Sequence, residues 1–319
     1  MKLLKRTINS TSFPAFVLFL ILVILNGFIT AGFFTPSFIN GFFAANSALI
    51  CIALGVSMVI ITGGIDLSTG AIVCFCNVTM VTLFEKGWKI APTLALILLL
   101  SVAAGALNGL LVSVFRINAM MATFGTQSMF AGLALWIRDI PGGSAPAELC
   151  RWFSGRVLGI IPVSLIVILA VLAVILLIMK TKVGLSLYAI GSSEERAFVS
   201  GIPVVKMKFL AYTVCGVCAG MASICYTART GGGDPTAGLT LTLNSIAACV
   251  IGGLSLSGGK GSAVGGLWGA FFLQLIITTV LALRISTMVQ DLVTGLIILL
   301  GMVGTIIAFS RKRKGAAIR

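Results

Sequence analysis

The chain has 319 residues, of which 59% are hydrophobic and only 9% are charged, whereas an ordinary soluble domain has about 25% charged residues. This composition excludes a soluble globular protein, and a length of 319 residues accommodates ten helices of about 20 apolar residues each. The net charge of +14 indicates membrane topology rather than nucleic acid as a partner, because the chain is so apolar. Without a single His, the chain lacks the usual catalytic triads and the commonest zinc ligand.

Ten apolar stretches predict an all-α membrane protein whose residues 1–319 form a single transmembrane domain. The first is too long for a typical signal peptide, so we expect it to be retained as a span. The stretch at 241–254 is short, which leaves a broken or re-entrant helix as the alternative there. The stretches fall near residues 13–32, 42–62, 68–84, 92–115, 117–137, 160–179, 204–227, 241–254, 262–283 and 287–309.

The distribution of basic residues predicts the orientation of these spans. If both termini are cytoplasmic, 15 of the 22 basic residues lie in inside segments and 7 lie outside, as the positive-inside rule requires. The polar segment 138–159 is then a periplasmic loop, and Trp152 and Phe153 are candidates for the membrane surface. The polar segment 180–203 is then a cytoplasmic loop.

A short helix is predicted inside this cytoplasmic loop. Ser192 is a capping residue type, acidic residues follow it in the first turn, and Gly201-Ile-Pro203 ends the helix. Ala197, Phe198 and Val199 place apolar atoms where only water would cover them. We interpret the helix as a docking element, with a solvated linker helix as the alternative.

Asp66 is the strongest single candidate for function, because a carboxylate between apolar spans is costly in lipid and usually faces a water-filled path or a partner. The alternative is that Asp66 caps the helix that begins near Leu67. Amides inside the spans are candidates for a path taken by an uncharged solute, although hydrogen bonds between helices are as common a use. These amides are Asn77, Asn108, Gln127 and Asn244.

Glycine spacing predicts close helix packing rather than a phosphate site. Gly105-x-x-x-Gly109, Gly216-x-x-x-Gly220 and the series Gly261, Gly265, Gly269 have the spacing that lets helices approach. Ser257-Gly-Gly-Lys-Gly-Ser262 departs from a nucleotide-binding loop at both ends, so no nucleotide site is expected. The pair Cys215-x-x-Cys218 is expected to be small-residue packing rather than a redox or metal site.

Two glycine-rich segments echo each other. Gly63-Gly-Ile-Asp-Leu-Ser-Thr-Gly70 and Gly252-Gly-Leu-Ser-Leu-Ser-Gly-Gly259 agree at five of eight positions, and each follows an apolar stretch. Interrupted spans in corresponding parts of a duplicated bundle are typical of transport paths. The repeat therefore indicates a transporter built by duplication.

Four sequence blocks are spread over nearly the whole chain. They are Gly63–Gly70, Leu107-Asn-Gly-Leu-Leu111 with Ala122-Thr-Phe-Gly-Thr126, Gly191-Ser-Ser-Glu-Glu-Arg-Ala-Phe-Val-Ser-Gly-Ile202, and Ile246-Ala-Ala-Cys-Val-Ile-Gly-Gly-Leu-Ser-Leu-Ser-Gly-Gly-Lys-Gly261. With these blocks, which follow the family's order, the sequence resembles the permease subunits of bacterial ABC importers of the ribose, or simple-sugar, type.

The resemblance implies a ten-helix permease in the bacterial inner membrane. Its partners would be a second permease, identical or different, two cytoplasmic ATPase subunits that hydrolyse ATP, and a periplasmic substrate-binding protein. No catalytic residue, cofactor or metal is expected in the chain itself. The segment at about 191–203 would be the coupling helix on the ATPase, with Glu194, Glu195, Arg196, Ala197, Phe198 and Gly201.

The chain departs from the family pattern at three places, which bear on the cargo more than on the fold. Thr242-Leu-Asn-Ser245 replaces the common Glu-Leu-Asp-Ala, Asn118 replaces a common Pro, and Thr294 replaces a Lys in the last span. The expected cargo is a monosaccharide, moved by alternating access along a path that includes Asp66 and three amides. These amides are Asn77, Asn108 and Asn244.

Other functions remain open from the sequence. A nucleoside, an autoinducer sugar or a branched-chain amino acid are alternative cargoes for the same permease. An ion-coupled secondary transporter with a proton or sodium ion on Asp66 is a second class. A membrane-embedded enzyme is disfavoured, because we find no base, nucleophile or metal cluster in the sequence.

Overall fold

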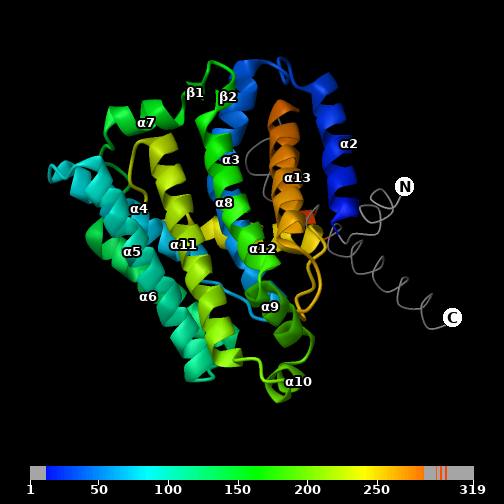
Figure 1. The fold of residues 1–319 in the computed structure, drawn as a ribbon. Coiled ribbons are helices and arrows are strands. Elements are labelled where there is room, and N and C mark those ends of the chain that lie inside the picture. Colours follow the sequence, from blue (N-terminus) through cyan, green and yellow to red (C-terminus); the bar gives the residue numbers. More distant parts are fainter. Residues whose placement is uncertain (1–11, 284–291, 293–294, 297–298, 300–319) are drawn as a thin grey trace.

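A computed structural model of the chain describes residues 12–283, 292, 295–296 and 299. In this part the chain is almost entirely helical (Figure 1). The predicted last span, 287–309, lies outside the described residues except at isolated positions. The helices are α2 (Phe13–Ile29), α3 (Pro36–Ile61), α4 (Thr69–Glu85), α5 (Ile90–Gly109), the π-helical η1 (Leu110–Val114), α6 (Ala119–Ile137), α7 (Ala147–Phe153), α8 (Val163–Lys180), α9 (Lys182–Ser192), α10 (Glu194–Val199), α11 (Val204–Thr230), α12 (Leu239–Ile251) and α13 (Ala263–Ala282).

Each apolar stretch predicted before residue 284 overlaps one of the apolar helices, and the stretch at 92–115 overlaps both α5 and η1. Five are long and apolar enough to cross a membrane, namely α3, α5 with η1, α8, α11 and α13. The helices α2, α4 and α12 are apolar but shorter. With 13 residues, α12 falls short of the roughly 20 residues that cross a bilayer. The chain is therefore a multi-pass membrane protein in which α12 does not span the bilayer alone.

The core of the bundle is built around α3. Every residue from Leu49 to Ile61 is buried, as expected for a helix that is apolar on all sides. The helices α8, α11, α12 and α13 surround it, and α11 also packs along α5. This central position of α3 brings its last residue, Ile61, to the region where the functional segments meet.

Glycines allow α5 and α11 to pack backbone against backbone. A Cβ added to Gly105 would lie 2.8 Å from the Cα of Gly216, and one added to Gly216 would lie 2.7 Å from the Cα of Gly105. The predicted role of these glycines in close packing is confirmed. Gly265 likewise contacts Gly252 of the α12 end. The prediction was wrong for Gly261, which lies in the turn before α13 with a φ of 106°.

The cysteine pair on α11 also serves packing. A Cβ added to Gly55 of α3 would lie 2.6 Å from the Cβ of Cys218, and the Cα of Cys215 is also a close neighbour. Both cysteines are buried and free. This confirms the prediction that Cys215-x-x-Cys218 is a small-residue contact.

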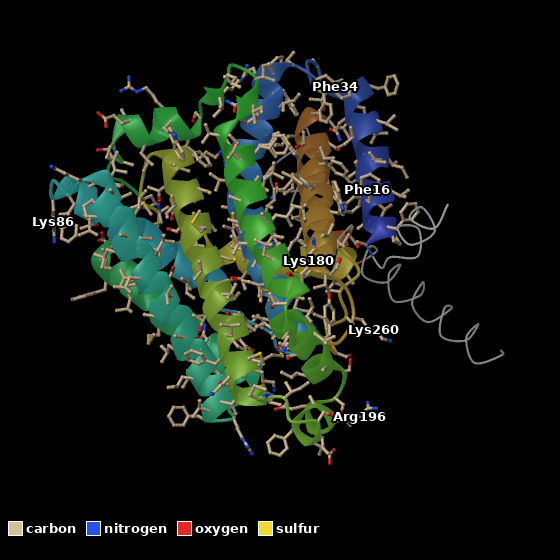
Figure 2. The ribbon with its side chains drawn as sticks, in the orientation of Figure 1. Phe16, Phe34, Lys86, Lys180, Arg196 and Lys260 are labelled. Carbon is tan, nitrogen blue, oxygen red and sulfur yellow. The ribbon has the colours of Figure 1, made fainter. Side chains whose placement is uncertain are left out.

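The two polar segments lie at opposite ends of the molecule (Figure 1). We name these the α7 end, which also holds the hairpin of β1 (Arg156–Val157) and β2 (Ile161–Pro162), and the α10 end. Figure 2 shows Phe34 toward the α7 end and Arg196 at the α10 end. Phe153 of α7 is buried, which corrects its predicted place on the membrane surface, whereas Trp152 is exposed.

The part of the predicted cytoplasmic loop that precedes α10 is itself a helix, α9. Thr181 caps it, and its side chain accepts a hydrogen bond of 3.1 Å from the amide of Val183. Leu187 and Ile190 are buried on one face, a one-sided apolar pattern that favours a packed helix. The prediction missed α9 because its two glycines and four hydroxyl or charged residues outweighed this pattern in a segment of 11 residues.

Candidate functional site

The helix α10 forms at the place that its capping residues predict. The Ser193 hydroxyl accepts a hydrogen bond of 3.4 Å from the amide of Arg196, so the cap lies one residue after the predicted Ser192. Glu194 and Glu195 occupy the first turn, where acidic side chains stabilise the helix dipole. Gly201 ends the helix with a φ of 80°, a conformation that glycine adopts readily.

The apolar residues of α10 divide between its two sides. Ala197 is only 4% exposed, because it packs on Ile190 and Val204 of the same chain. Phe198 and Val199 are 72% and 80% exposed. Ala197 therefore needs no partner to cover it, which corrects the sequence-based interpretation. The exposed apolar surface of α10 consists of Phe198 and Val199.

Glycines join α10 to the rest of the bundle at what we call the glycine junction, formed by Gly63, Gly191, Gly258 and Gly259. A Cβ added to Gly191 would lie 1.9 Å from the Ile61 carbonyl oxygen and 2.4 Å from the amide of Gly259. One added to Gly258 would lie 2.7 Å from the amide of Gly63. Three chain segments thus meet at backbone distance just before α10.

The glycine junction places the two segments of the sequence echo side by side. Gly63 belongs to the first segment, Gly258 and Gly259 belong to the second, and Gly191 is next to last in α9. The Tyr188 hydroxyl adds a hydrogen bond of 2.8 Å to the Gly261 carbonyl oxygen. Burial raises the pKa of the Tyr188 phenol, so it stays protonated and keeps this donor. Displacement of α9 and α10 would therefore move both segments.

Asp66 lies in the α3–α4 connection at the start of a buried hydrogen-bond network. Its Oδ1 atom accepts from the amide of Ser68 at 2.9 Å and from the Ser68 hydroxyl at 2.7 Å. The Asn108 amide of α5 donates to the same hydroxyl at 2.7 Å, and the Thr126 hydroxyl of α6 donates to Asn108 at 2.6 Å. The network ties the Asp66 loop to two helices. Thr126 lies in one of the blocks that carry the family resemblance, but it was not among the predicted site residues.

The second carboxylate oxygen of Asp66 has no hydrogen-bond partner in the described chain, and neither has the Tyr212 hydroxyl. A Cβ added to Gly64, two residues before Asp66, would lie 2.5 Å from that hydroxyl. Cys215 is another neighbour of the carboxylate. Sequence reasoning missed these α11 residues because they are far from Asp66 along the chain. Because buried polar atoms are normally paired, the unpaired oxygens of Asp66 and Tyr212 make this contact a candidate for rearrangement.

Asn77 holds the loop between α11 and α12. Its amide donates to the Thr227 hydroxyl at 2.8 Å, and its Oδ1 atom accepts from the amide of Asp234 at 2.7 Å. Asn244 of α12 is half-buried, and the described part of the chain offers its side chain no hydrogen bond. The four predicted path residues are thus not gathered at one place. Their role in a solute path stays a prediction.

A cleft of about 1020 Å³ opens between the α3–α4 connection, the η1–α6 turn, α10 and the start of α11. Gly63, Gly64 and Tyr212 line it, so it reaches the other side of the Asp66 loop. The charged side chains that line the cleft carry both signs, and they are Arg116, Glu194, Glu195, Lys206 and Lys208. Among them, Lys208 forms an ion pair with Glu194. The cleft therefore places charged side chains of both signs beside apolar ones such as Phe198 and Ile202.

Residues 37–302 match the protein family described as the permease component of the branched-chain amino acid transport system. The matched segment contains α10, the glycine junction and the Asp66 network. The chain belongs to this permease family. Membership makes the chain a permease component of a transport system.

Curated relatives of the permease are named autoinducer 2 import system permease protein LsrC. The protein from Yersinia pestis (strain Pestoides F) is 32% identical over 303 residues, which cover 93% of this chain and 85% of the relative. The protein from Yersinia enterocolitica is 33% identical over 297 residues, covering 91% and 81%. The protein from Escherichia coli O157:H7 is 31% identical over 303 residues, covering 93% and 87%. No solved structure matches the chain.

Two departures of the permease from the common family sequence have local roles in the structure. The Thr242 hydroxyl accepts a hydrogen bond of 2.8 Å from the amide of Gly70, where α12 meets α4. The Asn118 side chain caps α6 by accepting 3.0 Å from the amide of Met120. Thr294 lies outside the described residues. The first two replacements therefore support the fold at their positions.

Proposed function

We propose that the chain is the permease subunit of an ATP-driven bacterial importer that moves a monosaccharide-sized polar solute across the inner membrane. The supporting observation is α10, which exposes Phe198 and Val199 at one end of the bundle while its other side is joined through α9 to the glycine junction. A docked partner would cover these two apolar side chains. An ATPase subunit docked there would move the junction directly.

The proposed topology has ten spans, of which the one at 241–254 is completed by the residues that flank α12, with both termini in the cytoplasm, the α10 end inside and the α7 end outside. The excess of basic residues in the segments assigned to the inside supports it. In this orientation α10 and the cleft beside it face the cytoplasm, where the ATPases would bind. The substrate-binding protein would meet the α7 end.

In the proposed mechanism, closure of two ATPases moves α10 of each of two permease subunits, and the bundles tilt to alternate access. The glycine junction transmits this motion to α3 and to the loop of Asp66. Because the chain offers no nucleotide-binding motif of its own, the energy would come from the ATPase.

The cargo class follows from the resemblance to simple-sugar importers, and the LsrC relatives make the autoinducer-2 sugar the first solute to test. The departures at Thr242 and Thr294 are consistent with a cargo that differs from that of the common family members. Ribose, a nucleoside and a branched-chain amino acid are the comparison solutes.

The test is uptake into proteoliposomes that contain the permease complex, with the binding protein outside and ATP inside. We expect solute to accumulate with ATP in the absence of any ion gradient. Uptake driven by a proton or sodium gradient without ATP would instead establish a secondary transporter. Preference among the solutes would identify the cargo class.

A further inference from the structure

Tyr212 of α11 and Asp66 of the α3–α4 connection face each other with unused hydrogen-bonding capacity. Both residues are fully buried, yet the Tyr212 hydroxyl and the Asp66 Oδ2 atom have no hydrogen-bond partner in the described chain. The hydroxyl lies against the loop that carries Asp66, since a Cβ added to Gly64 would lie 2.5 Å from it. The two groups are close enough to interact electrostatically. A phenol donates and a carboxylate oxygen accepts, so the two unpaired atoms are complementary.

One face of α11 connects this pair to α10. Lys208, Tyr212 and Cys215 follow one another at spacings of four and three residues, which places their side chains on the same side of the helix. At one end of this face, Lys208 forms an ion pair with Glu194 of α10. At the other end, Cys215 is a neighbour of the Asp66 carboxylate. Motion of α10 would therefore act on the turn of α11 that precedes Tyr212.

The structure also leaves room for α10 and the start of α11 to move. Ala197 of α10 packs on Val204, the first residue of α11, so we expect the two helices to move together at this end. The cleft of about 1020 Å³ separates them from the η1–α6 turn and reaches Gly64. A shift of α10 with the start of α11 would thus change the volume of the cleft rather than displace a packed helix.

We infer that Tyr212 is a positioning residue of transport, whose hydroxyl donates a hydrogen bond to the Asp66 Oδ2 atom only after the ATPases have moved α10. In the described conformation both atoms are buried and unpaired, which raises its free energy. In the second conformation each atom would satisfy the other. Because the bond exists in one conformation only, it favours that conformation in the equilibrium between the two. The inference rests on the ATP-driven mechanism of the proposed function.

The first test compares Tyr212→Phe with Ser223→Ala as the matched control. The Ser223 hydroxyl is also buried on α11 without a partner in the described part of the chain, but it lies about 16 Å further along the helix. Each variant removes an unpaired hydroxyl, so we expect both to accumulate normally and to melt at or above the melting temperature of the parent. Tyr212→Phe should lower ATP-driven uptake at least tenfold, as expected for one lost buried hydrogen bond. Ser223→Ala should leave uptake unchanged.

Each contrary result of this comparison overturns the inference. Normal uptake by Tyr212→Phe, or an equal loss in Ser223→Ala, would show that the Tyr212 hydroxyl has no specific role. Poor accumulation or a lower melting temperature of Tyr212→Phe would show that the hydroxyl is already bonded in the resting conformation. If the parent complex itself lacks ATP-driven uptake, the proposed function fails as well, so the two failures are distinguished.

The second test follows the Asp66 carboxyl group directly by infrared difference spectroscopy. Spectra of the complete complex at rest are compared with spectra of the complex trapped with ATP and vanadate, and the Asp66 band is assigned by its absence in Asp66→Asn. We expect trapping to shift this band in the parent, because a new hydrogen bond changes the carboxyl stretching frequency, and to leave it in place in Tyr212→Phe. A shift that persists in Tyr212→Phe, or no shift in the parent, overturns the inference even if uptake is intact.

Discussion

The Ile61 carbonyl oxygen, at the end of the central helix α3, accepts a hydrogen bond of 2.9 Å from the backbone amide of Gly259. These residues are almost 200 positions apart, and Gly191 of α9 lies against both of them. The bond fixes the second glycine-rich segment to the first and leaves no room for a side chain between them. In the proposed mechanism, this is the contact through which motion of α10 would reach the centre of the bundle.

Gly191→Ala should disrupt this contact, because the new methyl group would lie 1.9 Å from the Ile61 oxygen. The backbones must separate, and overpacking of this kind costs about 1–3 kcal/mol. We expect a lower melting temperature in detergent and loss of solute-stimulated ATPase activity in the reconstituted complex. Gly41→Ala adds the same methyl group in open space and should leave both unchanged. If Gly191→Ala retains full solute-stimulated ATPase activity, the glycine junction does not transmit the motion of α10.

Phe198→Asp should weaken binding of the ATPase subunit without unfolding the permease. The side chain is 72% exposed, so the charge costs the isolated permease little, whereas burying an unpaired carboxylate in an interface is costly. Loss of a central contact of about 2 kcal/mol corresponds to roughly 30-fold weaker binding. Pull-down of the ATPase from membranes and an uptake assay measure the effect.

Ala197→Asp is the contrasting variant, because Ala197 is buried against Ile190 and Val204. We expect it to lower the accumulation of the permease itself. Phe198→Leu keeps an apolar side chain and should retain most ATPase binding. If Phe198→Asp binds the ATPase normally, α10 is not the docking element.

Asp66→Asn and Asp66→Ala separate charge from hydrogen bonding. Asparagine keeps the oxygen that accepts from Ser68, whereas alanine leaves the buried Ser68 amide unpaired at a cost of about 1–3 kcal/mol. We expect Asp66→Ala to accumulate poorly and Asp66→Asn to accumulate normally with reduced uptake. Immunoblots of membranes and initial uptake rates measure the two effects. Normal uptake by Asp66→Asn would limit the residue to a capping role.

Cys150 of α7 provides a test of orientation. The other cysteines of the chain are buried, so an impermeant maleimide should react chiefly with Cys150. We expect labelling in intact spheroplasts, since the α7 end is proposed to face outward. The variant Cys150→Ser gives the background. Labelling only after lysis would mean that the proposed topology is inverted.

The sequence by itself determined the membrane class, the approximate positions of the long apolar helices before residue 284, and α10 with its glycine end. These features depend on local composition and on residue types whose backbone preferences act within a few positions. The glycine spacings in α5 and α11 also predicted close packing, since small residues have few other uses at that spacing.

Only the tertiary structure decided which side chains meet. In the structure, Ala197 is buried against Ile190 and Val204 of the same chain. Asn77 accepts a hydrogen bond from the loop after α11, and Tyr212 and Cys215 lie beside Asp66. The tertiary structure also brings Gly191 between two segments that are distant along the chain. Helix periodicity gives the direction of a side chain relative to its own axis, but the neighbour depends on how the helices assemble. That arrangement follows from burial and close packing summed over the whole bundle, which no single segment encodes.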